Sequence, residues 1–216
     1  MIQHQTGVLS TGRGTHRQAP KRIMGPIGYA SLFQPLMNQA KSLRPITKAP
    51  IRTLVVMGVS GTGKSTLSRA LSESLAWRFV EGDDFHSREN VEKMSRGEPL
   101  NNNDRRPWLD QLNREIENDQ RKGVRSIVAC SALKKRYRDR LTHGLDGVQF
   151  VFLCGTRDVI LNRLRNRRGH FMPPDLLDSQ IASLEPPEDA IFVPVELSTE
   201  QQVEEVIRQL SDVSEA

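Results

Sequence analysis

Hydrophobic and polar positions alternate between two patterns from residue 53 onward. Short runs of apolar, often β-branched residues predict strands that are buried on both faces. These runs are Thr53–Met57, Phe79–Glu81, Ser126–Cys130, Gln149–Cys154 and Ile191–Glu196. Between them, apolar residues recur at spacings of three and four, which is typical of helices with one buried face. Strands and helices that alternate in this way predict an α/β fold of three layers, with a doubly wound parallel sheet between helices.

Several stretches carry the helical spacing. The expected helices are marked by Leu67 to Leu75, by Trp108 to Ile116 after Pro107, by Lys134 to about Thr142, by Val159 to Leu164, and by Val203 to Leu210. Ser198 and Gln201 resemble a capping box, which predicts that the last helix begins beside them.

Residues 1–50 differ from the rest of the chain in composition. They contain seven Lys or Arg residues, no Asp or Glu, and frequent Gly and Pro. Since the whole chain carries a formal charge of +5, residues 51–216 carry −2. The sequence pI of 9.5 therefore does not imply that residues 51–216 bind nucleic acid. No apolar run approaches 18 residues, so no transmembrane helix is expected.

We interpret residues 1–50 as a basic leader that its composition predicts to be disordered. A mitochondrial transit peptide is one alternative, because such segments are rich in Arg and lack acids. A translation start at Met24 or Met37 is another. The expected compartment is the cytoplasm, or the mitochondrion if the leader is a transit peptide. Cys130 and Cys154 lie in apolar runs and are expected to be buried, reduced thiols.

A glycine-rich segment follows the first strand and fits the pattern G-x-x-x-x-G-K-[ST]. It comprises Gly58, Val59, Ser60, Gly61, Thr62, Gly63, Lys64 and Ser65, with Thr66 next to it. Glycines let successive backbone N–H groups, together with a helix N-terminus, form a site for anions. Lys64 is expected to reach the β- and γ-phosphates of a nucleotide, and the Ser65 hydroxyl to bind Mg²⁺. A regulatory GTPase is not expected, because no N-K-x-D segment is present.

A cluster of polar residues follows the brief second strand. Glu81, Asp83, Asp84 and His86 come at its carboxyl end, and the carboxyl ends of parallel strands face one crevice. We therefore expect this acidic loop beside the phosphate loop, where carboxylates hold Mg²⁺ waters and orient an acceptor hydroxyl. Phosphoryl transfer depends on such positioning more than on strong base catalysis. The pattern favours a small-molecule kinase.

Several further segments resemble the gluconokinase family, within the P-loop group that includes shikimate kinase. The matching segments, in the family's order over about residues 52–197, are MGVSGTGKST (57–66), EGDDFH (81–86), NVEKMSRG (90–97), PLNNNDRRPWL (99–109), CSALKKRYRD (130–139) and GHFM (169–172). The chain departs from the family at Asn102 and Asn103, where acids are frequent, and at Ser87, where proline is common. The resemblance implies a kinase domain over residues 51–216 and a homodimer.

The resemblance also implies transfer of the γ-phosphate of ATP to the 6-hydroxyl of D-gluconate. By position, Asp83 is the expected partner of the acceptor hydroxyl, and Glu81 helps to hold Mg²⁺ through water. Asp84 is a further candidate. Asp104 is expected to pair with Arg105.

Gluconate is an acidic polyol, so its site needs a cation for the carboxylate and hydrogen bonds for the hydroxyls. Arginine offers carboxylates a bidentate geometry, which favours Arg105 and Arg138. His86 and Lys134 are expected contacts for hydroxyls or phosphate. Trp108 begins an apolar stripe and is expected in the core.

A cluster of arginines precedes a segment rich in Gly and Pro near residues 163–177. Arg163 and Arg167 fall at i and i+4, where like charges repel unless an anion offsets them. The Gly and Pro residues predict a hinge that closes a short helical lid over ATP. By resemblance, Arg163 and Arg167 clamp phosphate, with Arg163 as a catalytic residue beside Lys64 and Asp83. His170, in the moving segment, is expected at the substrate.

Two other functions stay open. A kinase of another small hydroxy acid or sugar acid would share the scaffold and differ in its pocket residues. A non-catalytic, nucleotide-dependent interaction protein would use residues 1–50 to contact nucleic acid or a membrane, with binding that is sensitive to salt. For residues 51–216 we expect gluconate and ATP as partners, and neither nucleic acid nor a membrane.

Overall fold

The computed structural model describes residues 50–166 and 176–214. Its sheet consists of β1 (Thr53–Met57), β2 (Arg78–Glu81), β3 (Ser126–Ala129), β4 (Val148–Cys154) and β5 (Ala190–Pro194). The strands lie in the order β2–β3–β1–β4–β5, and each pairing is parallel. This order confirms the predicted doubly wound sheet, and it puts β3 between β1 and β2.

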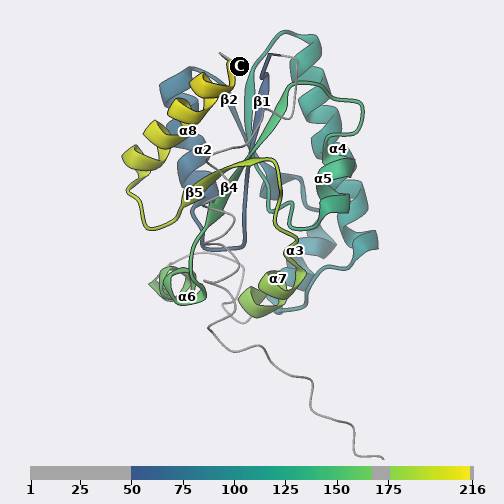
Figure 1. Ribbon diagram of the computed structural model, residues 1–216. Helices are drawn as coiled ribbons and strands as arrows, with labels where there is room; N and C mark the ends of the chain where they lie inside the picture. The colour runs from purple at the N-terminus through teal and green to yellow at the C-terminus, as the bar shows by residue number, and fades with distance from the viewer. Residues whose placement is uncertain (1–49, 167–175, 215–216) are drawn as a thin grey trace, which may run out of the picture.

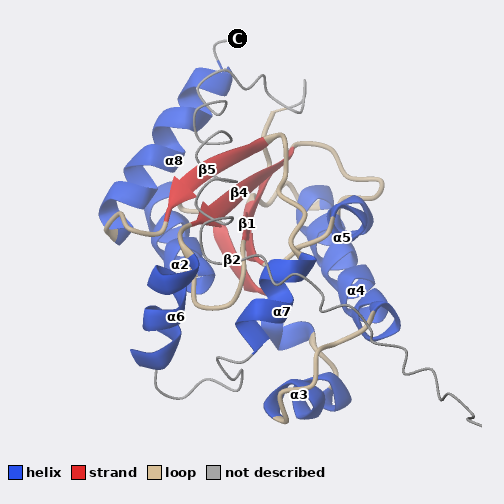
Figure 2. Cartoon of the chain, turned by 60° about the horizontal axis from the view of Figure 1, so that its bottom comes forward, coloured by secondary structure: helices blue, strands red, loops and turns tan. Residues whose placement is uncertain are grey.

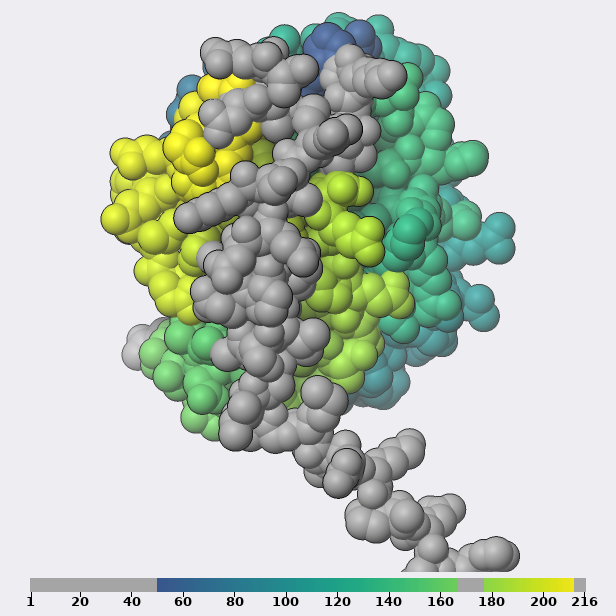
Figure 3. Space-filling model, viewed as in Figure 1, coloured from purple at the N-terminus to yellow at the C-terminus, as the bar shows by residue number. Residues whose placement is uncertain are grey.

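Helices cover both faces of the sheet. The helices are α2 (Lys64–Leu75), α3 (Arg88–Ser95), α4 (Asn102–Arg121), α5 (Lys135–Leu141), α6 (Arg157–Asn166), α7 (Leu176–Ser183) and α8 (Thr199–Ser214), with a short 3₁₀ helix η2 (Gly82–Phe85). In Figure 1, α2 and α8 lie on one side of the sheet and α4 and α5 on the other. Figure 2 shows α6, α7 and α3 gathered at one end of the molecule. The space-filling view in Figure 3 places α8 and the α4–α5 pair on opposite flanks.

Side chains of β1 alternate between two hydrophobic clusters. Leu54 and Val56 pack in the cluster that contains α2, while Val55 and Met57 pack in the cluster that contains α4. All four are fully buried. Burial on both faces explains why this strand reads as a continuous apolar run. It also fixes the carboxyl end of β1, where the phosphate loop begins.

The helix α4 begins at Asn102, earlier than the expected start after Pro107. The Asn101 side chain accepts hydrogen bonds from the N–H groups of Asn103 (2.8 Å) and Asp104 (3.0 Å). Asp104 in turn accepts from the Asn101 N–H at 2.8 Å, which completes a capping box. This cap stabilises the helix start enough to include Pro107, which gives up one backbone hydrogen bond.

Two helices, α3 and α7, are not among the sequence predictions. α3 is capped by Ser87, whose side chain accepts from the Asn90 N–H at 3.3 Å. Ser87 thus gives the helix a cap at the position where proline is common in the family. The capping box of Ser198 and Gln201 at the start of α8 is confirmed, with hydrogen bonds of 2.9 and 3.2 Å.

Both cysteines are buried and free, as expected. Burial raises the pKa of each thiol to about 12, so neither is nucleophilic at neutral pH. In the described residues, no helix combines the length and the apolar character that a membrane crossing requires.

Candidate active site

The phosphate loop forms a turn between β1 and α2. Gly61 and Gly63 have positive φ angles of 84° and 96°, and Gly63 caps the helix that begins at Lys64. The Thr62 hydroxyl donates to the Val59 carbonyl at 2.9 Å, and Lys64 Nζ donates to the same oxygen at 3.2 Å. The loop is therefore braced from within, with its N–H groups at the positive end of a helix dipole.

Gly61 is required by a neighbouring helix as well as by its backbone angle. A Cβ at this position would lie 2.6 Å from Leu164 Cγ of α6. The helix that carries Arg163 thus packs directly onto the phosphate loop. Arg163 donates to the Val195 carbonyl and lines the same cavity as the loop.

The acidic loop is positioned by β3 and α4. Gly82 passes so close to the end of β3 that a Cβ would lie 2.3 Å from the Ala129 carbonyl oxygen. Trp108 Nε1 donates to the Gly82 carbonyl at 2.7 Å. These two contacts fix the short 3₁₀ turn and direct Asp83 into the cavity.

His86 stacks on Trp108, with ring centroids 4.2 Å apart and an interplanar angle of 21°. Burial lowers the pKa of His86 to about 4, and Arg105 adds to this effect while Asp83 opposes it. The imidazole is therefore neutral at pH 7. Trp108 itself is buried in the core, as expected, and supports a site residue from beneath.

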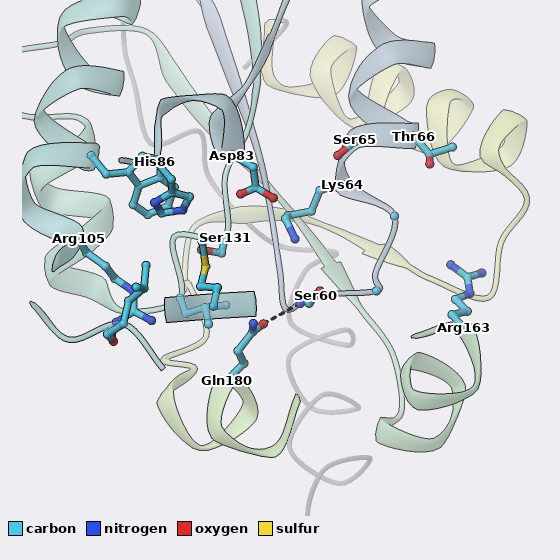
Figure 4. A pocket seen from close by; sticks show the side chains of 16 residues that line it. Ser60, Lys64, Ser65, Thr66, Asp83, His86, Arg105, Ser131, Arg163 and Gln180 are labelled. Carbon is cyan, nitrogen blue, oxygen red and sulfur yellow. Dashed lines mark hydrogen bonds between the residues drawn. The ribbon is translucent and has the colours of Figure 1, made fainter. Parts of the chain in front are cut away.

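One cavity of about 360 Å³ joins the phosphate loop to the acidic loop. Of the expected site residues, those that line it are Ser60, Gly61, Gly63, Lys64, Ser65, Thr66, Asp83, His86, Arg105 and Arg163. In Figure 4 the side chain of Asp83 is directed toward that of Lys64. A lysine, a row of backbone amides and a carboxylate in one cavity are the groups that phosphoryl transfer to a hydroxyl needs.

Six further residues line the cavity but are not among the site residues expected from the sequence. They are Met94, Leu100, Trp108, Ser131, Leu133 and Gln180. Ser131 follows the end of β3, so the rule that the carboxyl ends of parallel strands face one crevice would have found it. No motif in the sequence indicates Gln180.

Six expected site residues that the structure describes lie outside the cavity lining, as does the further candidate Asp84. They are Gly58, Val59 and Thr62 of the phosphate loop, and Glu81, Lys134 and Arg138. The expectation that Arg138 contacts the substrate is not supported by its position. Its side chain is buried, and its Nη1 donates to the carbonyls of Ala132, Leu133 and Glu185. These bonds tie α5 to the loop after β3 and to the chain after α7. Lys134 is the N-cap residue of α5, and its Nζ lies 6.0 Å from the centroid of the Tyr137 ring. Arg167 and His170 lie outside the described residues.

The expected pairing of Asp104 with Arg105 is also wrong. The Asp104 carboxylate bonds to Lys93 Nζ at 3.0 Å and to the Asn101 N–H, and these contacts hold the pKa of Asp104 below its usual value. Arg105 instead donates to the Leu100 carbonyl and lies 5.4 Å from the centroid of the Tyr137 ring.

A magnesium ion has suitable oxygen donors here. Among the residues that the structure describes, no group of three His, Cys, Asp or Glu side chains could hold a metal ion by itself. Mg²⁺ typically binds through one or two protein oxygens, with phosphates and waters as its other ligands. The Ser65 hydroxyl and the Asp83 carboxylate, which both line the cavity, fit this arrangement.

Fold and site together define a P-loop kinase that acts on a small molecule. Residues 54–187 match the family model described as an AAA domain. The chain is 44% identical over 160 residues to the gluconokinase of Gluconobacter oxydans, covering 73% of this chain and 90% of the relative. It is 46% identical over 133 residues to the thermoresistant gluconokinase of Escherichia coli, covering 62% and 76%.

A solved structure agrees with these relatives. The gluconokinase from Sinorhizobium meliloti superposes with a TM-score of 0.69 at 38% identity, and the match covers 77% of this chain and 96% of that one. The chain belongs to the gluconokinase family.

Proposed function

We propose that this protein transfers the γ-phosphate of ATP to the 6-hydroxyl of D-gluconate, giving 6-phospho-D-gluconate. The observation that carries the proposal is that Lys64 and Asp83 line one cavity in a chain of the gluconokinase family. The cavity supplies separate places for the two reactants. Backbone amides and Lys64 suit the phosphates, while Asp83, His86 and Arg105 suit an anionic polyol.

In the proposed reaction, the loop amides and Lys64 hold the β- and γ-phosphates. Asp83 accepts a hydrogen bond from the 6-hydroxyl and aims its oxygen at the γ-phosphorus. Arg163, with Arg167 as a second expected clamp, balances charge on the transferred group. Ser65 would hold Mg²⁺, with Asp83 or a water-mediated contact from Glu81 as a second oxygen donor, and the ion would supply positive charge to the phosphates. His86, being neutral, both donates to and accepts from substrate hydroxyls.

The test is an assay of the full-length protein with ATP, offering D-gluconate, shikimate and AMP as acceptors. We expect turnover with gluconate and background release of ADP with the others. Turnover of another sugar acid or hydroxy acid in place of gluconate would favour the kinase alternative on the same scaffold. ATP binding without turnover of any acceptor would favour the interaction protein.

We also propose that the protein works as a homodimer in the cytoplasm, or in the mitochondrion if residues 1–50 are a transit peptide. The family resemblance supports the dimer, and light scattering after gel filtration tests it. Imaging the full chain and a chain that lacks residues 1–49 tests the compartment. A location that does not change on truncation would contradict a targeting role.

A further inference from the structure

The side chain of Gln180 reaches from α7 to the phosphate loop. Its Oε1 accepts a hydrogen bond from the backbone N–H of Ser60 at 2.7 Å. The two residues are 120 positions apart, and both line the cavity. A distant helix therefore contributes a polar group to the wall on which ATP phosphates are expected.

The hydrogen bond defines which way the amide of Gln180 faces. A backbone N–H only donates, so the oxygen of the side-chain amide, and not its nitrogen, has to meet Ser60. The Nε2 group belongs to the same planar amide and is held in place with it. This group carries two N–H donors and no acceptor, so it is suited to phosphoryl or hydroxyl oxygens and not to cations.

The amide of Gln180 also lies where the two halves of the cavity meet. In Figure 4 it adjoins Ser60 of the phosphate loop, with Asp83 and Ser131 on the acceptor side. Consecutive Cα atoms are about 3.8 Å apart, so an oxygen bound at the next loop amide, that of Gly61, is within reach of this side chain. A phosphate oxygen bound by the loop amides would therefore lie close to the Nε2 group of Gln180.

We propose that Gln180 is a γ-phosphate contact, whose Nε2 donates a hydrogen bond to the terminal phosphoryl group of ATP while Ser60 holds its Oε1. The inference rests on the proposed function, since it takes ATP as the phosphoryl donor. ADP lacks the terminal group, so this contact distinguishes ATP from ADP. A donor at the equatorial oxygens also stabilises the charge that is spread over them in the transition state.

A purely structural role for Gln180 makes a different prediction. A tether between α7 and the loop needs only the Oε1 acceptor, and Gln180→Glu keeps this acceptor while it removes both donors and adds a negative charge. Gln180→Met removes donor and acceptor without a charge. Gln201→Glu is the matched control, because it makes the same change where the side chain also accepts from a backbone N–H, in the capping box of Ser198. Glutamate serves that box equally well.

The experiment measures binding of ADP and of an ATP analogue with a methylene bridge between its β- and γ-phosphates, by calorimetry on the full-length variants. In Gln180→Glu we expect analogue binding to weaken at least about tenfold, ADP binding to change by less than about threefold, and kcat to fall about 100-fold. In Gln180→Met the affinity for the analogue should also fall more than the affinity for ADP, but by less than in Gln180→Glu. Gln201→Glu should bind both nucleotides as the wild type does.

Equal losses for the analogue and ADP, or a fully active Gln180→Glu protein, would overturn the proposal. If Gln180→Glu does not fold, the affinities of Gln180→Met for the analogue and for ADP test the proposal: equal losses of both would overturn it. A wild-type protein that binds the analogue but does not phosphorylate gluconate would refute the acceptor assignment, and the binding ratios would still decide the role of Gln180.

Discussion

Individual side chains in the cavity are held by contacts that reach well beyond the motifs. Asp83 owes its place to Gly82, which lies against Ala129, and to Trp108, which binds the Gly82 carbonyl. His86 in turn rests on Trp108. One tryptophan therefore orients both the carboxylate and the imidazole that line the cavity.

The substitution Asp83→Asn should lower kcat by about 100-fold or more, because the amide no longer accepts the hydroxyl proton or aims the oxygen. The KM for ATP should change by less than about twofold, since phosphate binding lies with the loop. Steady-state kinetics with varied ATP and gluconate measure both. Asp139→Asn is a suitable control, because Asp139 is exposed and pairs with Lys135. A rise in the KM for ATP as the main effect would contradict this role.

His86 predicts a loss of stability in mild acid. Its pKa is about 4 in the folded chain, below the ordinary value of 6.5 for histidine. Between pH 4 and pH 6.5, therefore, the unfolded chain takes up this proton and the folded chain does not. Stability from the neutral imidazole is complete above pH 6.5 and is lost as the pH falls toward 4. We expect the free energy of unfolding in urea to fall by about 2 kcal/mol from this group between pH 7 and pH 5.

The variant His86→Phe keeps an aromatic ring on Trp108 but cannot titrate. Its free energy of unfolding should therefore vary less between pH 7 and pH 5 than that of the wild type. Equal slopes in both proteins would mean that the pKa of the imidazole is the same in the folded and the unfolded chain, which would contradict the shift.

Among the elements, α6 and the phosphate loop form one packed unit, because Leu164 lies against Gly61. Arg163 sits one residue before this contact, so its position depends on how the helix packs on the loop. The arginine and the amides are therefore brought to the cavity together.

The substitution Gly61→Ala should displace α6 from the loop and raise the KM for ATP. It should also lower the free energy of unfolding by about 2–4 kcal/mol, through backbone strain at positive φ together with the overpacking. Gly123→Ala is the control, because Gly123 has φ of 70° but no atom within 4 Å of an added Cβ. It should cost about 1 kcal/mol from strain alone. Equal losses in both variants would show that the contact with Leu164 is unimportant.

How far the sequence predicts an element depends on how local its signals are. The signals for the phosphate loop, the strands and the capping box at Ser198 lie in residues that are neighbours in the chain, so the sequence predicts all of them. The start of α4 was missed because Pro107 suggested a boundary, although Asn101 and Asp104 supply a stronger signal upstream. Arg138 could not be told from a substrate contact, since its three carbonyl partners come from segments that only the fold assembles.

At the scale of the whole molecule, the members of both hydrophobic clusters that the structure describes come from residues 51 onward. We therefore expect a chain of residues 50–216 to fold and to keep the kcat of the full-length protein within about twofold, because it retains every core side chain that the structure describes. Thermal unfolding and the gluconate assay check this. A truncated chain that loses activity, or a full chain whose nucleic-acid binding vanishes on truncation, would instead give residues 1–49 a functional part.

The strand order has a consequence for synthesis on the ribosome. The phosphate loop and the acidic loop are complete by residue 86, yet β3, the strand that separates β1 from β2 and on which Gly82 rests, ends only at Ala129. A nascent chain that ends before β3 contains the phosphate loop and the acidic loop, but it lacks the strand that separates β1 from β2. The distance between the two loops is therefore set only after β3, which contributes no predicted catalytic side chain, has been made and has entered the middle of the sheet.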